Sequence, residues 1–348
     1  MRNLISMLLA VLLPFSVPAP ADAQELPGLH ALSAVLMAED GEVLFAQEAD
    51  RMLPIASTTK LMTALVVIEN CDLEESVEIQ PAWCGIEGSS VYLKPGDRYT
   101  VRELLLGLLL ASGNDAATAL ACHCAGDIAA FSELMNRRAA ELGMSGSHFT
   151  NPHGLNEAGH YSTARDLALL MLETMKNEKL SALIGMDKAQ CGNETVYNHN
   201  KLLHRYAGCI GGKTGYTEAA GRCLVSCVER NDLRFVCVTL NDPDDWNDHA
   251  KLYDWGYAHF MARVINADNE RHELPLLGGT VSSAVAVPAE EVKILLPRDS
   301  ELLVNTELPF YVFAPVSRGA AAGRMILRDG ERILREIPLV YAEDYPVQ

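Results

Sequence analysis

The amino-acid sequence predicts an α+β fold in which a large domain of helices and antiparallel strands precedes a small β-rich domain. Two strand-like runs, 32–36 and 42–47, flank the Asp40-Gly41 turn and indicate a β-hairpin. Apolar helical runs then alternate with loops as far as residue 262. From about Asn266 onward the pattern changes to short alternating runs, which are typical of strands. The 348 residues suffice for both domains.

Local signals predict the elements of the large domain in order. Thr100-Val101-Arg102-Glu103 is a capping-box pattern, and it predicts a helix over 104–111. Further helices are expected over 60–70, 116–124, 131–142, 163–175 and 248–262. Strands are expected over 77–79, 91–93, 211–215, 223–229 and 234–240.

The last 83 positions, 266–348, contain short alternating runs that predict strands. Asp329-Gly330 is a hairpin turn between the last two of them. The expected strands are 281–287, 292–296, 310–314, 324–327 and 332–340. We therefore expect a domain over 24–262 and a small β-rich domain over 266–348.

The first residues have the pattern of an export signal. Arg2 supplies the positive charge, 4–17 is mostly apolar, and Ala21-Asp22-Ala23 is a small-residue cleavage site before Gln24. The alternative, a transmembrane anchor, is less favourable because the apolar run is short and ends in prolines. We expect a signal peptide over 1–23, no membrane-spanning segment in the mature chain, and an exported protein of the cell envelope or the extracellular space.

The charge balance excludes some partners. With 28 Lys and Arg against 46 Asp and Glu, the formal net charge is −18. Such a chain offers no basic stripe for nucleic acid. An anionic small substrate is still compatible, because one buried lysine can dominate the potential of a small pocket.

Nine cysteines leave at least one without an intrachain disulfide partner. Cys122-His123-Cys124 resembles a metal clip, but helix positions two apart point away from each other. We expect buried thiols there, with no metal and no cofactor. Cys227 and Cys237 are expected to face each other across a hairpin, where buried thiols are favoured over a disulfide.

Three short strings carry the chemistry. In Ser57-Thr58-Thr59-Lys60 the spacing of three places a hydroxyl and an amine on one face of a helix start, at or near the N-cap. A serine becomes nucleophilic when a base takes its proton, and a lysine acts as base when burial and a second cation lower its pKa. Lys213 is the candidate for that cation.

The second string, Ser112-Gly113-Asn114, interrupts two apolar helical runs and is expected to expose a hydroxyl and an amide toward a cleft. Ser112 can relay a proton to a leaving amine, and Asn114 can hold a substrate amide. The third, Lys213-Thr214-Gly215, predicts a strand that binds a carboxylate, pairs with an extended peptide and supplies N–H groups to an oxyanion hole with Ser57. Each string alone also fits an ordinary cap, helix break or surface turn, but together they predict a serine acyl-transfer site.

These strings resemble those of the penicillin-binding protein and serine β-lactamase superfamily, and more narrowly the low-molecular-mass serine-type D-alanyl-D-alanine carboxypeptidases of the peptidase S11 kind. The resemblance implies an antiparallel sheet flanked by helices, an all-helical region and a C-terminal β domain. It also implies removal of the terminal D-Ala from peptidoglycan pentapeptides, and covalent inhibition by β-lactams. Supporting stretches are 55–63, 88–93, 107–117, 151–155, 161–164 and 212–225.

The resemblance also implies residue roles. Ser57 is the acylated nucleophile, Lys60 its base, and the N–H groups of Ser57 and Tyr216 form the oxyanion hole. Some relatives use an arginine after the third string to hold the substrate carboxylate, but the matching region 241–246 is acidic. Carboxylate binding is then expected from Lys213, Thr214 and Thr217.

Alternatives stay open within and outside this superfamily. A class A β-lactamase needs Glu-x-x-Leu-Asn, whereas this chain has Pro152-His153-Gly154-Leu155-Asn156, so at most slow β-lactam hydrolysis is expected. An endopeptidase acting on D-Ala cross-links is the second alternative. The third is a non-catalytic wall-binding module, which the intact Ser57, Lys60 and Lys213 disfavour. Relatives often end in an amphipathic membrane helix, and 341–348 has no basic amphipathic pattern.

Overall fold

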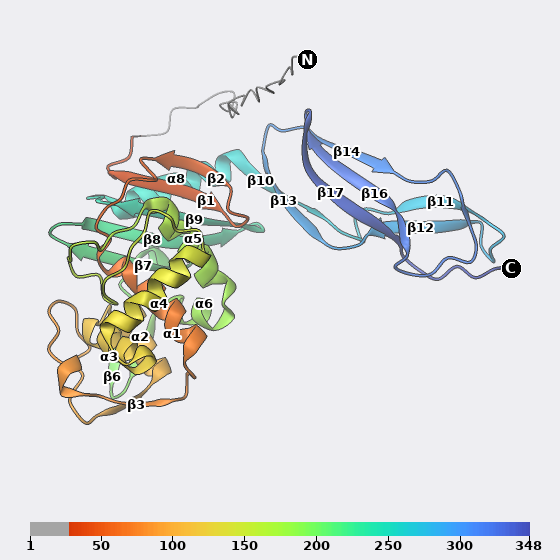
Figure 1. The fold of residues 1–348 in the computed structure, drawn as a ribbon. Helices are drawn as coiled ribbons and strands as arrows, with labels where there is room; N and C mark the ends of the chain where they lie inside the picture. Colours follow the sequence, from red (N-terminus) through yellow and green to blue (C-terminus); the bar gives the residue numbers. More distant parts are fainter. Residues whose placement is uncertain (1–27) are drawn as a thin grey trace, which may run out of the picture.

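The computed structural model describes residues 28–348, and Figure 1 shows a mixed helical and sheet region followed by an elongated region built of strands. The predicted signal segment 1–23 lies outside the described residues. A five-stranded antiparallel sheet, in the order β2-β1-β9-β8-β7, forms the centre of the first region. Its strands are β1 (Ser33–Ala38), β2 (Val43–Gln47), β7 (Cys209–Thr217), β8 (Gly221–Arg230) and β9 (Leu233–Leu240).

Both faces of this sheet are covered by helices. Leu36 belongs to a core on the side of α8 (Asp245–His259), whereas its neighbour Met37 belongs to the larger core on the opposite side. Period-two alternation along each strand therefore divides the apolar residues between two cores. The larger core also involves α1 (Lys60–Asn70), α2 (Val101–Leu109), α3 (Asn114–Ala125), α4 (Ile128–Glu141), α5 (Ala164–Lys176) and α6 (Glu178–Ile184). The short helix α7 (Leu202–Arg205) precedes β7.

The helix starts follow the sequence signals closely. The Thr100 side chain and Glu103 form the reciprocal hydrogen bonds of a capping box at α2, and Thr163 caps α5. The helix predicted to reach residue 262 ends at His259, because Phe260–Ile265 forms strand β10 and pairs with β13 (Val292–Pro297).

Two small hairpins complete the first region, β3 (Ser76–Glu78) with β4 (Arg98–Thr100) and β5 (Lys188–Cys191) with β6 (Glu194–Tyr197). The strand predicted over 91–93 is wrong, because these residues form a loop. The Asp115 carboxylate holds that loop by accepting hydrogen bonds from the Val91 and Leu93 N–H groups and from the Ser90 hydroxyl.

The region after residue 265 is β-rich, as predicted, and has its own apolar core. A six-stranded sheet runs in the order β14-β16-β17-β12-β11-β15. Its strands are β11 (His272–Leu277), β12 (Ser283–Pro288), β14 (Leu302–Glu307), β15 (Val312–Phe313), β16 (Ala321–Asp329) and β17 (Arg332–Tyr341).

The cysteine expectations need two corrections. Cys227 lies opposite Val236, and Cys237 lies opposite Ser226, so the two thiols point to opposite faces of the sheet and into different cores. They cannot face each other across the hairpin. Cys122 and Cys124 are half-buried rather than buried.

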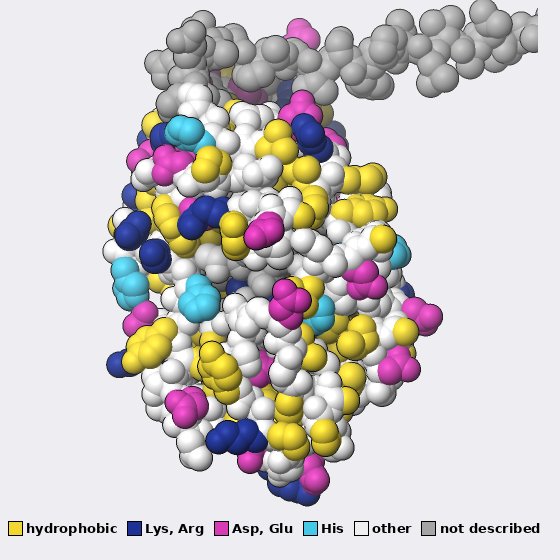
Figure 2. Space-filling model, turned by 90° about the vertical axis from the view of Figure 1, so that its left-hand side faces the viewer, with side chains coloured by type: hydrophobic (Ala, Val, Ile, Leu, Met, Phe, Trp, Pro, Cys, Tyr) yellow, Lys and Arg dark blue, Asp and Glu magenta, His cyan; other side chains and the backbone are white. Residues whose placement is uncertain are grey.

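The surface charges are mixed. On the face shown in Figure 2, Lys and Arg side chains are interspersed with acidic ones and form no stripe. Among residues 28–348, no helix combines the length and the apolar character that crossing a bilayer requires.

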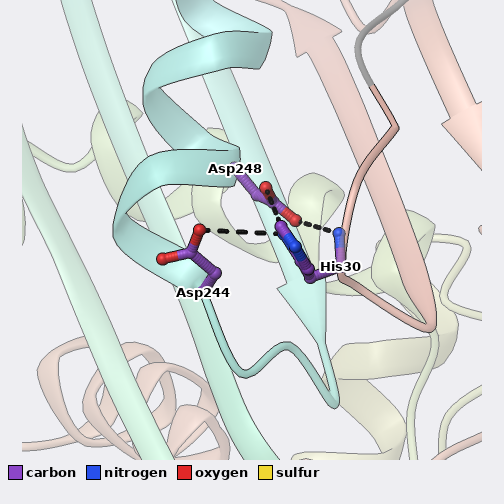
Figure 3. A group of neighbouring side chains, drawn as sticks. All are labelled: His30, Asp244 and Asp248. Atoms are coloured by element: carbon purple, nitrogen blue, oxygen red, sulfur yellow. Dashed lines mark hydrogen bonds and ion pairs between the residues drawn. The ribbon is translucent and has the colours of Figure 1, made fainter.

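The N-terminal segment is held by a buried carboxylate at the start of α8 (Figure 3). Asp248 accepts hydrogen bonds from the backbone N–H groups of His30 and Ala31, and Lys251 donates to its other oxygen at 2.8 Å. Asp244 lies 3.7 Å from the His30 ring. The partners of Asp248 give this carboxylate a structural role, which is to fix the chain as it enters β1.

Candidate active site

Ser57 lies in a 3₁₀ turn, η1 (Ala56–Thr59), that leads directly into α1. The N-cap position of α1 is occupied by Thr59, two residues later than the sequence suggested. Gly154 lies against this turn, and a β-carbon on it would be 1.9 Å from the Ala56 carbonyl oxygen. Position 154 therefore requires a glycine. The absence of a side chain there lets the 151–155 loop pack directly on the turn that carries Ser57.

Lys60 is fully buried and its amine contacts three oxygens. The Nζ atom donates to Ser57 Oγ at 2.7 Å, to Asn114 Oδ1 at 2.6 Å and to the His153 carbonyl at 2.9 Å. Asn114, the first residue of α3, is itself held because its amide nitrogen donates to the Glu87 carbonyl. The first two strings therefore meet at the Lys60 amine.

The environment of Lys60 favours the neutral amine. Burial lowers the pKa of Lys60 well below its usual value, and the nearby Lys213 cation lowers that pKa further. Asp115 opposes this effect, and its contribution is smaller. In the neutral form, the 2.7 Å contact allows the Ser57 hydroxyl to donate its proton to Nζ.

Ser112 and Lys213 form the second half of the site. Ser112 has a positive φ of 60°, a conformation that non-glycine residues seldom adopt. The Lys213 amine donates to Ser112 Oγ at 3.1 Å and to the Thr214 carbonyl at 2.9 Å. Burial lowers the pKa of Lys213 to about 7. The helix break predicted between α2 and α3 thus carries a hydroxyl that contacts the second lysine.

Strand β7 is an edge strand of the sheet, and η1 lies beside it. A β-carbon on Gly215 would stand 3.0 Å from the Ser57 backbone nitrogen and 3.0 Å from the Ile55 carbonyl oxygen. Glycine is therefore needed for the strand to come this close to the Ser57 turn. The arrangement sets the backbone of β7 beside the Ser57 N–H, as an oxyanion hole requires.

A cleft of about 340 Å³ opens over these groups. Ser57, Ser112, Thr214, Gly215 and Tyr216 line it, and Lys60, Asn114 and Lys213 are buried behind them. The lining residues that the sequence reasoning missed are Ser89, His199, Lys201, Arg222, Asp245 and Trp246.

Of the last two predicted site residues, Tyr216 lines the cleft and Thr217 does not. Tyr216 lines the cleft, and it is 66% exposed, so its ring is available to a bound molecule. The Thr217 hydroxyl donates to Asn156 Oδ1 at 3.1 Å and accepts from the Ala220 N–H. Thr217 is thus engaged in closing the turn after β7, and it lies outside the residues that line the cleft.

Comparison with known proteins decides the family. Residues 20–244 match the sequence model of peptidase S11, D-alanyl-D-alanine carboxypeptidase. The chain belongs to this carboxypeptidase family. It is 31% identical to the D-alanyl-D-alanine carboxypeptidase DacF of Bacillus subtilis, over 99% of this chain and 95% of that protein. It is 32% identical to DacC of Escherichia coli, over 92% of this chain and 85% of that protein.

Solved structures of the family share the fold. Penicillin-binding protein 5 of Haemophilus influenzae superposes with a TM-score of 0.73 at 27% identity, covering 92% of this chain and 98% of that one. Penicillin-binding protein 6B of Escherichia coli gives a TM-score of 0.73 at 28% identity, with 94% and 98% covered. The α+β fold with a C-terminal β region, and the resemblance to low-molecular-mass penicillin-binding proteins, are therefore confirmed.

Within this carboxypeptidase family fold, Arg222 is the most informative residue that the sequence reasoning missed. It lies on β8 directly opposite Tyr216. Its Nη2 donates to both oxygens of Asp245, at 2.7 and 2.8 Å, and its Nε donates at 3.1 Å. The guanidinium also lies 5.7 Å from the ring centroid of Trp246. The acidic 241–246 segment contains no cation of its own, but its Asp245 binds the Arg222 guanidinium of strand β8.

The signal for Arg222 is the register of strand pairing, which the three sequence strings do not contain. The turn after Thr217 ends at Gly221, and antiparallel pairing across it sets Arg222 against Tyr216. His199 has no comparable signal, because it reaches the cleft from the loop between β6 and α7.

Proposed function

We propose that this chain removes the terminal D-Ala from peptidoglycan pentapeptide stems through an acyl-enzyme on Ser57. The observation that carries the proposal is the 2.7 Å contact between the Ser57 hydroxyl and a fully buried Lys60 amine. Membership of the D-alanyl-D-alanine carboxypeptidase family supports the substrate class. The same serine is proposed to be acylated by β-lactams.

The proposed mechanism assigns each proton. Lys60 takes the Ser57 proton while Oγ bonds to the carbonyl carbon of the penultimate D-Ala. The N–H groups of Ser57 and Tyr216 stabilise the oxyanion. Ser112 passes a proton to the nitrogen of the departing D-Ala and takes one in turn from the Lys213 ammonium, which contacts its hydroxyl. Water then hydrolyses the ester with the same groups in reverse roles.

Strand β7 is proposed to hold the substrate as an added strand. Its outer edge has no partner among the strands of the described sheet, so the Lys213-Thr214-Gly215 backbone can pair with an extended peptide. Asn114 is proposed to orient the substrate indirectly. Its side chain accepts a hydrogen bond from Lys60 and donates one to the Glu87 carbonyl, so it fixes both the base and the loop around Glu87. Thr214 and Tyr216 line the binding cleft, with Thr217 supporting the turn beyond them.

The direct test follows the released amino acid. A synthetic pentapeptide ending in D-Ala-D-Ala is incubated with the chain from Gln24 onward, and free D-Ala is measured over time. We expect catalytic release of one D-Ala per peptide. A cross-linked muropeptide dimer is assayed in parallel, because cleavage of the dimer with no release from the pentapeptide would favour the endopeptidase alternative. No turnover of either substrate would favour the non-catalytic module.

The Arg222 guanidinium is proposed to bind the terminal carboxylate of the substrate. We expect Arg222→Ala to raise the KM for the pentapeptide by roughly 10- to 100-fold, because a charge-assisted hydrogen bond contributes about 1.5–3 kcal/mol. A pentapeptide with a C-terminal carboxamide is the control, and its kinetics should change little in the variant. Equal losses for both peptides in steady-state assays would show that Arg222 only supports the fold.

Location and domain roles complete the proposal. Family membership implies action on the cell wall, and we infer export to the envelope or the extracellular space, with 1–23 as the signal peptide. We further propose that 24–262 is the catalytic domain and that 266–348 is a separate β-rich domain. Nucleic acid is not a proposed partner, which agrees with the net charge of −18.

A further inference from the structure

Two half-buried thiols lie at the far ends of the helices that carry the active site. Cys71 is the C-cap residue of α1, and Cys124 is the penultimate residue of α3. The two helices pack against each other, and at this end the His123 ring of α3 lies 3.4 Å from the carboxylate of Glu75, which follows α1. The Cys71 and Cys124 thiols are neighbours that interact with each other. Both side chains pack against the large core, and both are partly exposed to solvent. They are therefore adjacent and within reach of a small reagent.

The opposite ends of the same helices meet in the active site. Lys60 begins α1, Asn114 begins α3, and the Lys60 amine donates to the Asn114 side chain at 2.6 Å. The helices have 11 and 12 residues, so each is about 16–18 Å long. They form a parallel pair, joined at one end by a catalytic hydrogen bond and touching at the other end through Cys71 and Cys124.

We propose that Cys71 and Cys124 form a disulfide that clamps α1 to α3 when the protein meets a small-molecule disulfide. The Cys124 thiolate attacks one sulfur of the donor and releases one donor thiol, with a proton from the medium. Cys71 then loses its proton and attacks the mixed disulfide, which releases the second donor thiol. The protein loses two S–H bonds and gains one S–S bond, and the donor is reduced by the same two electrons.

The local chemistry agrees with this order of steps. The hydrogen bond from Cys71 lowers the pKa of the Cys124 thiol, whereas the pKa of Cys71 is raised. Cys124 is therefore the sulfur that carries the negative charge needed for attack. The closed loop would include residues 71–124, and closing a loop of this length restricts the unfolded chain strongly.

Four of the other thiols are less suited to pairing. Cys223, Cys227 and Cys237 are fully buried, and burial raises the pKa of each thiol. Burial raises the pKa of the Cys122 thiol, and the contact of this thiol with the Trp83 side chain offsets only part of that effect.

Peptide mapping tests the inference without any catalytic readout. The chain from Gln24 onward is equilibrated with oxidised and reduced glutathione, free thiols are alkylated, and the non-reduced digest is analysed by mass spectrometry. We expect a Cys71–Cys124 linked peptide and a loss of 2 Da from the intact mass. Alkylation of both thiols, or Cys71 linked to any other cysteine, would overturn the proposal.

Melting temperatures of variants show whether the disulfide stabilises the helix pair or forms without any effect on stability. Oxidation should raise Tm by about 5 °C in the wild type, a shift typical of a disulfide in a domain of this size. Cys71→Ser and Cys124→Ser should remove this redox dependence, and Cys84→Ser, a matched change outside the pair, should keep it. A linked peptide with no change in wild-type Tm would overturn the clamping role.

Discussion

Replacing Ser57 by alanine is expected to abolish covalent labelling by a fluorescent penicillin and to lower D-Ala release by about 10⁴-fold or more. The reason is that no other hydroxyl in the cleft contacts the Lys60 amine, among the hydrogen bonds of the described residues. Ser112 contacts the Lys213 amine instead. Gel fluorescence and a D-Ala assay measure the two effects separately.

Ser89→Ala is the matched control, because Ser89 lines the same cleft and makes no contact with either lysine among the described hydrogen bonds. This variant should keep labelling within a few fold of wild type. Labelling that survives in Ser57→Ala at the wild-type rate would show that another residue is acylated. Equal melting temperatures of the wild type and the two variants exclude unfolding as the cause.

The extent to which the fold could be predicted follows from how local each signal is. The capping box at Thr100 and the turn at Asp40-Gly41 act over four to six residues, and both predicted the neighbouring elements correctly. The 91–93 segment looks like a strand because Val91 is β-branched and Tyr92 is aromatic. Its conformation depends on Asp115, more than 20 residues later, whose carboxylate takes the hydrogen bonds that a strand partner would take.

The same distinction applies to the active site. The spacing in Ser57-Thr58-Thr59-Lys60 places the two reactive groups by local geometry alone, so their contact could be predicted. The contacts of Lys60 with Asn114 and of Lys213 with Ser112 join segments that are 54 and 101 residues apart. The presence of all three strings predicted one shared site, but these two contacts themselves were not predicted. Arg222 belongs to no such string, and its role depends on strand register and on Asp245.

The pH dependence of acylation provides the second large expected effect. Lys60 acts as a base only when it is neutral, so the rate of penicillin acylation should fall as the pH drops through the Lys60 pKa. Burial and the Lys213 cation both lower this pKa, which widens the pH range over which the neutral amine is present. The acid limb should therefore lie well below the usual pKa of lysine. Stopped-flow acylation measured across pH locates it.

Removing the Lys213 charge should move this limb in a defined direction. Lys213→Met takes away the cation that disfavours a second positive charge, so the pKa of Lys60 rises and the acid limb shifts to higher pH. Lys213→Arg keeps a cation there and should keep the limb near its wild-type position, even if the maximal rate falls. Lys60→Arg, always charged, should lose at least about 10³-fold in rate at every pH. If the Lys213→Met profile has its limb at the wild-type pH or lower, the second lysine does not control the base, and desolvation alone accounts for the neutral Lys60.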